Sequence, residues 1–194
     1  MKLVFATHNQ NKFNEVKELL PAQIELVSLT DIDCHDEIPE TAKTLKGNAQ
    51  LKADFVTQNY DLPCFADDTG LLVDALKGEP GVYSARYAGE QKNADDNMNK
   101  LLLELKNKNS RSAHFETVIA LNLNGEMIFF NGIAEGQITT SKCGKKGFGY
   151  DPIFQPKGYD KTFAELSLKV KNKISHRGKA IRQLVEYLHQ LSSK

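Results

Sequence analysis

The fold class follows from one stretch near the start of the chain, Lys2-Leu3-Val4-Phe5-Ala6-Thr7-His8-Asn9-Gln10-Asn11-Lys12-Phe13-Asn14-Glu15-Val16-Lys17-Glu18-Leu19-Leu20. Residues 2–6 are mostly apolar and predict a buried strand. From residue 12 onward, apolar residues recur at helical spacing until Pro21 stops the helix. A strand, a polar loop and a helix in this order are the opening unit of an α/β domain.

The pattern beyond this unit predicts further strands and helices. Asn124-Gly125 is a strong hairpin signal and joins two segments rich in β-branched and aromatic residues. Because no repeat or low-complexity linker divides the chain, we expect one two-lobed domain over residues 1–194. The other expected elements are a strand at 24–29, a helix at 45–58, a strand ending at Asp67, an apolar run at 71–76, a surface loop at 77–89, a helix at 93–105, hairpin strands at 114–123 and 127–139, and a helix at 175–191.

Composition excludes several function classes. Lys+Arg and Asp+Glu both total 25, so no net field attracts nucleic acid or a membrane surface, and neither is an expected partner. Three widely spaced cysteines without a C-x-x-C pair favour a reducing compartment. The apolar run at the N-terminus is too short for a signal peptide, so we expect a cytoplasmic protein.

The segment Phe65-Ala66-Asp67-Asp68-Thr69-Gly70 places two adjacent carboxylates after a short apolar run. Side chains alternate along a strand, so Asp67 and Asp68 cannot face the same cleft while the backbone stays extended. We therefore expect different roles for the two acids. The alternative is a strand end followed by an ordinary Asp/Gly turn.

The loop between the first strand and helix is suited to phosphate. A helix start offers backbone N–H groups and a partial positive charge, and this loop adds hydrogen-bonding side chains and the ammonium of Lys12. The alternative is an Asn-rich helix cap. Neither the Walker loop nor the dinucleotide fingerprint is present. Thr7 and Asn9 would donate hydrogen bonds to phosphate oxygens, and Lys12 would add a positive charge.

Two later segments could bind a nucleoside. Gly147-Phe148-Gly149-Tyr150-Asp151-Pro152 combines glycines, two aromatic rings and one carboxylate, although such a segment is often only a turn. Ser175-His176-Arg177-Gly178 could donate hydrogen bonds to a base edge, or Ser175 could simply cap the last helix.

Carboxylates are the expected metal ligands. No H-x-x-x-H spacing or cysteine pair indicates zinc, whereas Asp67, Asp68 and Glu40 would suit Mg²⁺. No G-x-S-x-G motif supports covalent acyl chemistry.

Together, these segments resemble the inosine triphosphate pyrophosphatase family, whose members hydrolyse non-standard purine nucleoside triphosphates such as ITP, dITP and XTP to monophosphate and pyrophosphate. The resemblance implies an Mg²⁺-dependent enzyme, usually a homodimer, with a long mixed central sheet, flanking helices and two lobes enclosing a nucleotide cleft. It is carried by residues 6–12, 66–71, 80–89, 147–154 and 174–177.

The resemblance also implies individual roles. Asp68 would be the catalytic base and would bind the metal with Glu40, while Asp67 would make supporting contacts or bind a second metal. Residues 7–12 would hold the triphosphate, and Lys171 would reach the phosphates or the base. The other residues implied to contact substrate are Thr69, Phe148, Gly149, Tyr150, Asp151, His176 and Arg177.

Base choice would rest on the 6-oxo group of hypoxanthine and xanthine, which would accept a hydrogen bond from His176 or Arg177; adenine offers a donor there. The alternatives are a pyrophosphatase for modified pyrimidine nucleotides and a non-catalytic nucleotide-sensing module.

Overall fold

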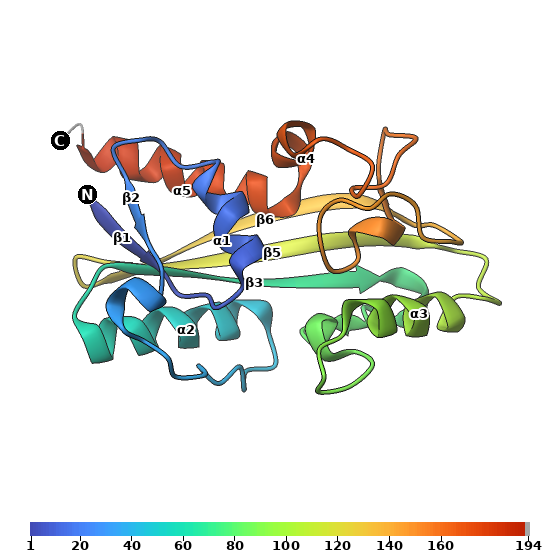
Figure 1. Ribbon diagram of the computed structural model, residues 1–194, viewed down its shortest axis with the longest axis horizontal. Coiled ribbons are helices and arrows are strands. Elements are labelled where there is room, and N and C mark those ends of the chain that lie inside the picture. Colours follow the sequence, from blue (N-terminus) through green and yellow to red (C-terminus); the bar gives the residue numbers. More distant parts are fainter. Residues whose placement is uncertain (193–194) are drawn as a thin grey trace. The chain divides into compact units, whose positions relative to one another are not determined.

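The computed structural model describes residues 1–192 and has a mixed α/β fold (Figure 1). In these residues a seven-stranded sheet has the order β2-β1-β3-β5-β6-β7, with β4 paired to β3. Strand β1 is parallel to β2 and β3, whereas β4 is antiparallel to β3 and β7 to β6, so the predicted mixed sheet is confirmed. The elements are β1 (Lys2–Phe5), α1 (Gln10–Lys17), β2 (Glu25–Val27), α2 (Leu45–Tyr60), β3 (Cys64–Val73), β4 (Pro80–Gly81), α3 (Ala94–Glu104), β5 (Ser112–Leu123), β6 (Glu126–Ile138), β7 (Phe154–Pro156), α4 (Leu168–Ile174) and α5 (His176–Ser192).

The chain divides into two compact units. The first contains Met1–Asp68, Thr117–Gly132 and the chain from Arg177 onward; the second contains Thr69–Glu116 and Ile133–His176. Each boundary in the central part of the chain falls inside a long strand, namely β3, β5 and β6. The single two-lobed domain stays a prediction.

In the first unit, alternation along β1 builds a core on each face of the sheet. Leu3 and Phe5 pack in a cluster with α1 and α5, whereas Val4 and Ala6 pack in a second cluster with α2 (Figure 1). The ring of Phe5 stacks on that of Phe65 in β3, with centroids 4.6 Å apart. Helices therefore cover both faces of the strands that lead to the predicted site.

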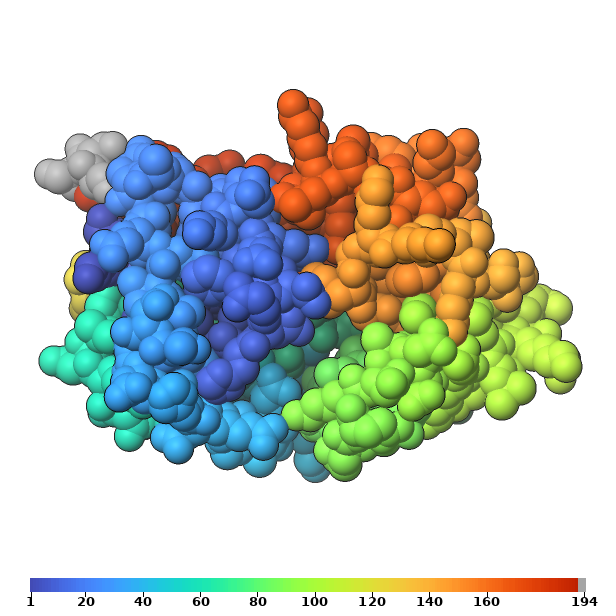
Figure 2. Space-filling model, in the orientation of Figure 1, coloured from blue at the N-terminus to red at the C-terminus, as the bar shows by residue number. Residues whose placement is uncertain are grey.

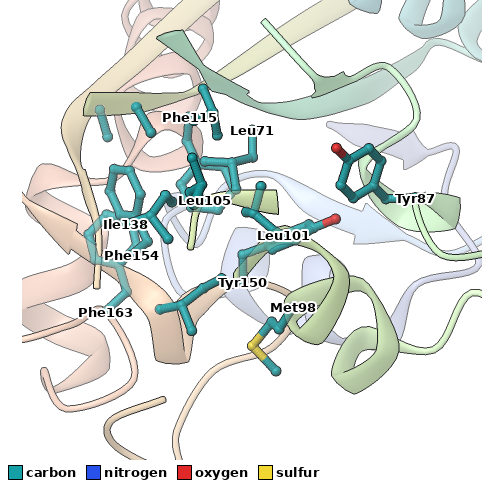
Figure 3. Packing of buried hydrophobic residues seen from close by; sticks show 14 residues of the cluster. Leu71, Tyr87, Met98, Leu101, Leu105, Phe115, Ile138, Tyr150, Phe154 and Phe163 are labelled. Carbon is teal, nitrogen blue, oxygen red and sulfur yellow. The ribbon is translucent and has the colours of Figure 1, made fainter. Parts of the chain in front are cut away.

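The second unit has its own apolar core (Figure 3). Three of its aromatic rings pack together, with the ring centroid of Phe154 4.7 Å from that of Phe115 and 5.0 Å from that of Phe163. Leu101 lies in helix α3 and Leu105 caps its C-terminal end; both are fully buried in the same cluster. This core supports the loop that contains residues 147–151.

Two expectations about strands had different outcomes. The predicted hairpin is confirmed, since β5 and β6 are joined through Asn124 and Gly125, which both have positive φ. The expected strand end at Asp67 is wrong: β3 continues to Val73, because its second half pairs with β4 at Leu71 and Leu72. Strand β7 and helix α4 are additional elements that the sequence pattern did not predict.

Candidate functional site

The extended backbone of β3 places Asp67 and Asp68 on opposite faces of the sheet. Asp67 bonds to residues of α1 and α5, whereas Asp68 bonds to residues of α2. Both side chains are buried. The expectation that the two acids have different surroundings is therefore confirmed.

Asp68 belongs to a polar cluster at the start of α2. Asn48 Nδ2 donates to Asp68 Oδ2 at 3.1 Å, and Asn48 Oδ1 accepts from the backbone N–H of Ala42. The ammonium of Lys52 lies 3.6 Å from Asp68 Oδ1 and 2.5 Å from Glu40 Oε1. Two carboxylates that are 28 residues apart in the chain therefore face one buried cation.

Burial and charge compete in this cluster. Burial raises the pKa of Asp68 above its ordinary value, and the nearby Lys52 ammonium only partly opposes this. Burial would lower the pKa of Lys52, but the carboxylates of Asp68 and Glu40 outweigh it, so the pKa is raised. A buried carboxylate with a raised pKa is a stronger proton acceptor than an exposed one, as a general base requires.

The loop before α1 is organised by Asn9. Its Oδ1 accepts from the N–H groups of Asn11 and Lys12, and its own N–H bonds to Thr7 Oγ1. The Asn9 cap therefore occupies two of the backbone N–H groups at the helix start that we expected to bind phosphate. His8 Nε2 bonds to the carbonyl of Asp36 at 2.9 Å.

The loop and the first turn of α1 remain accessible to solvent. His8, Asn9, Gln10 and Asn11 are exposed, and Thr7 is half-buried. This N-terminal region forms part of the face shown in dark blue in Figure 2. Gln10 Nε2 donates to Asn14 along the helix surface.

Asp67 joins the two cations on its side of the sheet. Lys12 Nζ donates to Asp67 Oδ1 at 2.9 Å, and Arg177 Nε donates to Asp67 Oδ2 at 3.1 Å. Burial would raise the pKa of Asp67, but these two cations outweigh it and hold the pKa well below its usual range. Burial lowers the pKa of Lys12, although Asp67 opposes this. Arg177 also donates to Glu15 Oε2 at 2.6 Å.

In the second unit, Asp151 holds the glycine-containing loop. Its Oδ2 accepts from the backbone N–H of Phe148 at 2.8 Å and from Lys171 Nζ at 2.6 Å. The same ammonium lies 5.0 Å from the ring centre of Phe148. Gly147 has φ +73°, and a Cβ there would lie 2.0 Å from Asp151 Oδ2, so glycine is required. Phe148, Asp151 and Lys171 are therefore brought together, and their contact with substrate stays a prediction.

Other predicted residues of this unit have mainly protein contacts. The hydroxyl of Tyr150 donates to the carbonyl of Ser84 at 2.8 Å, and the Tyr150 side chain is buried. The buried ring of His176 stacks on Phe115, with centroids 4.6 Å apart. Thr69 and Gly149 are partly buried. Substrate contact at each position stays a prediction.

Sequence reasoning missed three buried polar residues. Asn48 and Lys52 lie one turn apart on the buried stripe of α2, among Leu45, Ala49 and Ala53, and this position could have indicated their role. Glu15 lies three residues after Lys12 on α1 and is buried, although a glutamate on a helix is ordinarily exposed.

A cavity of about 590 Å³ in the second unit contains none of the predicted site residues. Two pairs of its polar side chains bond to each other: Lys157 to Glu135, and Gln137 to Gln155. The cavity therefore gives no support to the predicted chemistry, which rests on the bonded clusters above.

The Ham1 family model matches residues 3–187, which is most of the chain. The chain belongs to the Ham1 family. Relatives that match nearly the whole chain are named dITP/XTP pyrophosphatase. That of Flavobacterium johnsoniae is 64 % identical over 188 residues, covering 97 % of this chain and 98 % of the relative. That of Porphyromonas gingivalis is 53 % identical over 188 residues, covering 96 % and 97 %.

Solved Ham1 structures share the fold. The Ham1 protein of Staphylococcus aureus aligns with a TM-score of 0.89 at 40 % identity, covering 98 % of this chain and 99 % of that protein. The HAM1 protein of Coxiella burnetii gives 0.90 at 39 % identity with the same coverage. The family resemblance and the α/β fold predicted from the sequence are confirmed. In residues 1–192, every helix is too short or too polar to cross a membrane.

Proposed function

We propose that this protein hydrolyses non-standard purine nucleoside triphosphates (ITP, dITP and XTP) to the nucleoside monophosphate and pyrophosphate. Relatives that match nearly the whole chain are named dITP/XTP pyrophosphatase, which supports this substrate class. The observation that carries the proposal is the buried carboxylate of Asp68, which has a raised pKa and shares the Lys52 ammonium with Glu40.

Asp68 acts as the general base. Water adds across the anhydride linkage between the α- and β-phosphates; its oxygen bonds to phosphorus, the bridging P–O bond breaks, and Asp68 takes the proton. Asn48 holds one oxygen of Asp68, so the carboxylate keeps one orientation while it accepts the proton. Such a base typically contributes on the order of 10²–10⁴ to the rate.

Cations and amide groups of the first unit bind the triphosphate. Lys12 supplies an ammonium beside the exposed loop, and the Oδ1 of Asn9 caps the helix, which leaves its Nδ2 available to donate to a phosphate oxygen. Thr7 is partly exposed and completes the set. Neutralising the charge that builds up on the leaving pyrophosphate is the main electrostatic requirement of this reaction.

The carboxylates of Glu40 and Asp68 fit the implied Mg²⁺. They converge on one cation, the ammonium of Lys52, and carboxylate oxygens are the ligands that Mg²⁺ prefers. In residues 1–192, no cluster of three or more His, Cys, Asp or Glu side chains forms a metal site, but Mg²⁺ is usually held by one or two carboxylates with water and substrate phosphates. When bound, Mg²⁺ supplies charge neutralisation at the phosphates.

The residues expected to contact the nucleoside are Phe148, Asp151, Lys171 and His176. The ring of Phe148 offers a stacking surface, and Asp151 and Lys171 fix its loop. His176 donates to the 6-oxo group of hypoxanthine or xanthine. In ATP this donor would meet the 6-amino group, and leaving buried donors unpaired can give discrimination on the order of 10⁴.

A substrate panel tests the proposal. ITP, dITP, XTP, GTP, ATP and dUTP are compared at matched concentrations with Mg²⁺, and pyrophosphate release is measured for wild-type protein, Asp68→Asn and the exposed control Asp61→Asn. We expect release from ITP, dITP and XTP, a loss on the order of 10²-fold or more in Asp68→Asn, and no loss in the control. Hydrolysis of dUTP alone would indicate a pyrimidine enzyme, and binding without release a sensing module.

We also propose that the protein is a cytoplasmic homodimer, as the family resemblance implies. Light scattering after gel filtration measures the mass in solution, and a mass of about 43 kDa, twice the 21.7 kDa of the chain, is the expected result. A single-chain mass at micromolar concentration would contradict it.

A further inference from the structure

Four buried or nearly buried charged groups of the first unit are joined by three bonds into a chain that starts and ends on helix α1; we call this chain, which the helix itself closes, the ring. Lys12 on α1 bonds to Asp67 on β3, Asp67 bonds to Arg177 on α5, and Arg177 bonds back to Glu15 on α1. The three donor–acceptor distances are 2.9, 3.1 and 2.6 Å. The side chains of Asp67, Arg177 and Glu15 are less than a tenth exposed, and that of Lys12 is 15 % exposed.

The signs of the charges alternate around this ring. Lys12 and Arg177 are cations, Asp67 and Glu15 are anions, and the formal sum is zero. If Asp67 faced Lys12 alone, its full charge would act on that one ammonium and weaken the attraction of the ammonium for phosphate. Arg177 binds the second oxygen of Asp67, so the carboxylate is shared between two cations. Glu15 in turn balances the charge of Arg177. Without Glu15, the buried guanidinium would be paired with Asp67 alone.

The ring also fixes geometry. A lysine side chain loses much rotamer freedom when it is held in place, so a lysine that is already held binds phosphate with a smaller entropic cost. The ammonium of Lys12 has three donors, and its bond to Asp67 uses one of them. Glu15 lies three residues after Lys12 on the same helix, so the bond from Arg177 to Glu15 ties α1 to the group that holds Asp67.

We propose that Glu15 and Arg177 are positioning residues: through Asp67 they hold Lys12 where it binds the substrate phosphates. This inference rests on the proposed function, because it assumes that Lys12 contacts a triphosphate. It assigns to Arg177 a role different from hydrogen bonding to the base. Its Nε and one terminal nitrogen are bonded to carboxylates of the first unit.

A double-mutant cycle tests the connection to Lys12. Glu15→Ala is compared with wild type, and the same change is made in a Lys12→Ala background, with kcat/KM for ITP measured at saturating Mg²⁺. We expect Glu15→Ala to lower kcat/KM about tenfold or more in the wild type and less than about twofold once Lys12 is absent. Glu15→Gln keeps an acceptor for Arg177, so its loss is expected to be smaller than that of Glu15→Ala.

Controls separate this role from a general effect on folding or on the base. Glu18→Ala changes an exposed glutamate at the end of the same helix and is expected to leave kcat/KM unchanged. Arg177→Ala is expected to leave the ratio of ITP to ATP hydrolysis within about threefold of wild type. If Glu15→Ala does not fold, Glu15→Gln takes its place in the cycle.

Each contrary outcome overturns a specific statement. An equal loss from Glu15→Ala with and without Lys12 would mean that Glu15 acts only on the fold, and no loss would overturn the positioning role. A large change in the ITP to ATP ratio in Arg177→Ala would restore base recognition to that residue. Wild-type protein that releases no pyrophosphate from any substrate would overturn the proposed function itself.

Discussion

Replacing Lys52 by methionine keeps most of the side-chain volume and removes the cation between Glu40 and Asp68. The ammonium is 3.6 Å from Asp68 Oδ1, and at an effective dielectric constant of about 20 this separation corresponds to roughly 4–5 kcal/mol. Burial of the ammonium offsets part of this, and Glu40 is a third exposed, so solvent weakens its contribution. We expect the free energy of unfolding to fall by about 3 kcal/mol at pH 8, near the lower end for breaking a buried ion pair.

The loss should depend on pH. Because folding raises the pKa of Lys52, the stabilisation from its charge is complete below the ordinary lysine pKa. It is lost only as the pH rises through the pKa of Lys52 in the folded protein, so wild type keeps it at both pH 5 and pH 8. In the variant, Asp68 loses the cation that lowers its pKa, and the pKa rises further. Asp68 in the folded variant then binds a proton more readily than it does in the unfolded chain, so acidification stabilises the variant. The loss of unfolding free energy relative to wild type should therefore be smaller at pH 5 than at pH 8, by about 1 kcal/mol or more.

Urea unfolding at both pH values, with EDTA present to remove divalent cations, measures this effect. Lys2→Met is the matched control: Lys2 pairs with Glu25 at 3.5 Å, but both side chains are mostly exposed, and the expected change is below about 1 kcal/mol. A loss below about 1 kcal/mol for Lys52→Met at pH 8, or a deficit that does not shrink at pH 5, would refute the reasoning.

Two further predictions concern the first unit's core and the thiols. Phe65→Ala removes a fully buried ring that stacks on Phe5, and urea unfolding should show a loss of about 3–5 kcal/mol; a loss below about 1 kcal/mol would contradict the packing. A thiol reagent at pH 8 should label the partly exposed Cys143 first, while the fully buried Cys34 and Cys64 react only on unfolding, since burial also raises the pKa of Cys64; equal labelling rates in native protein would contradict this.

The parts of the fold that depend on local pattern were predictable from the sequence. The first strand and the Asn124-Gly125 turn appear as predicted, because each is set by residues close together in the chain. The helix after the first strand also forms, but it spans Gln10–Lys17 and ends before Pro21 is reached. The continuation of β3 beyond Asp68 was not predictable in this way. Its second half pairs with β4 at Leu71↔Gly81 and Leu72↔Pro80, and the loop between these nearby segments carries no hairpin signal like Asn124-Gly125.

The same distinction applies to the candidate site. The alternation of Asp67 and Asp68 follows from strand geometry alone, so their separation could be predicted. The surroundings of each acid could not. Lys52 reaches Asp68 only after α2 has packed on β3, and Glu15 meets Arg177, which bonds to Asp67, only after α1 and α5 have packed on the other face. A charged residue on a helix is ordinarily assigned to the surface. Charged residues within an apolar helical stripe are the signal to search for.

The position of both acids inside a continuous strand has a consequence for changes in chain length. Inserting or deleting one residue in β3 ahead of Asp67 would rotate every later side chain to the opposite face. After a deletion, Asp68 would take the place of Asp67 beside Lys12 and Arg177. After an insertion, Asp67 would take the place of Asp68 beside Asn48 and Lys52. If the change precedes Phe65, then Phe65 and Ala66 also exchange faces, and each leaves the apolar cluster that it fills. Substitutions in this strand alter one contact at a time, whereas a change of a single residue in its length exchanges both sets of surroundings at once.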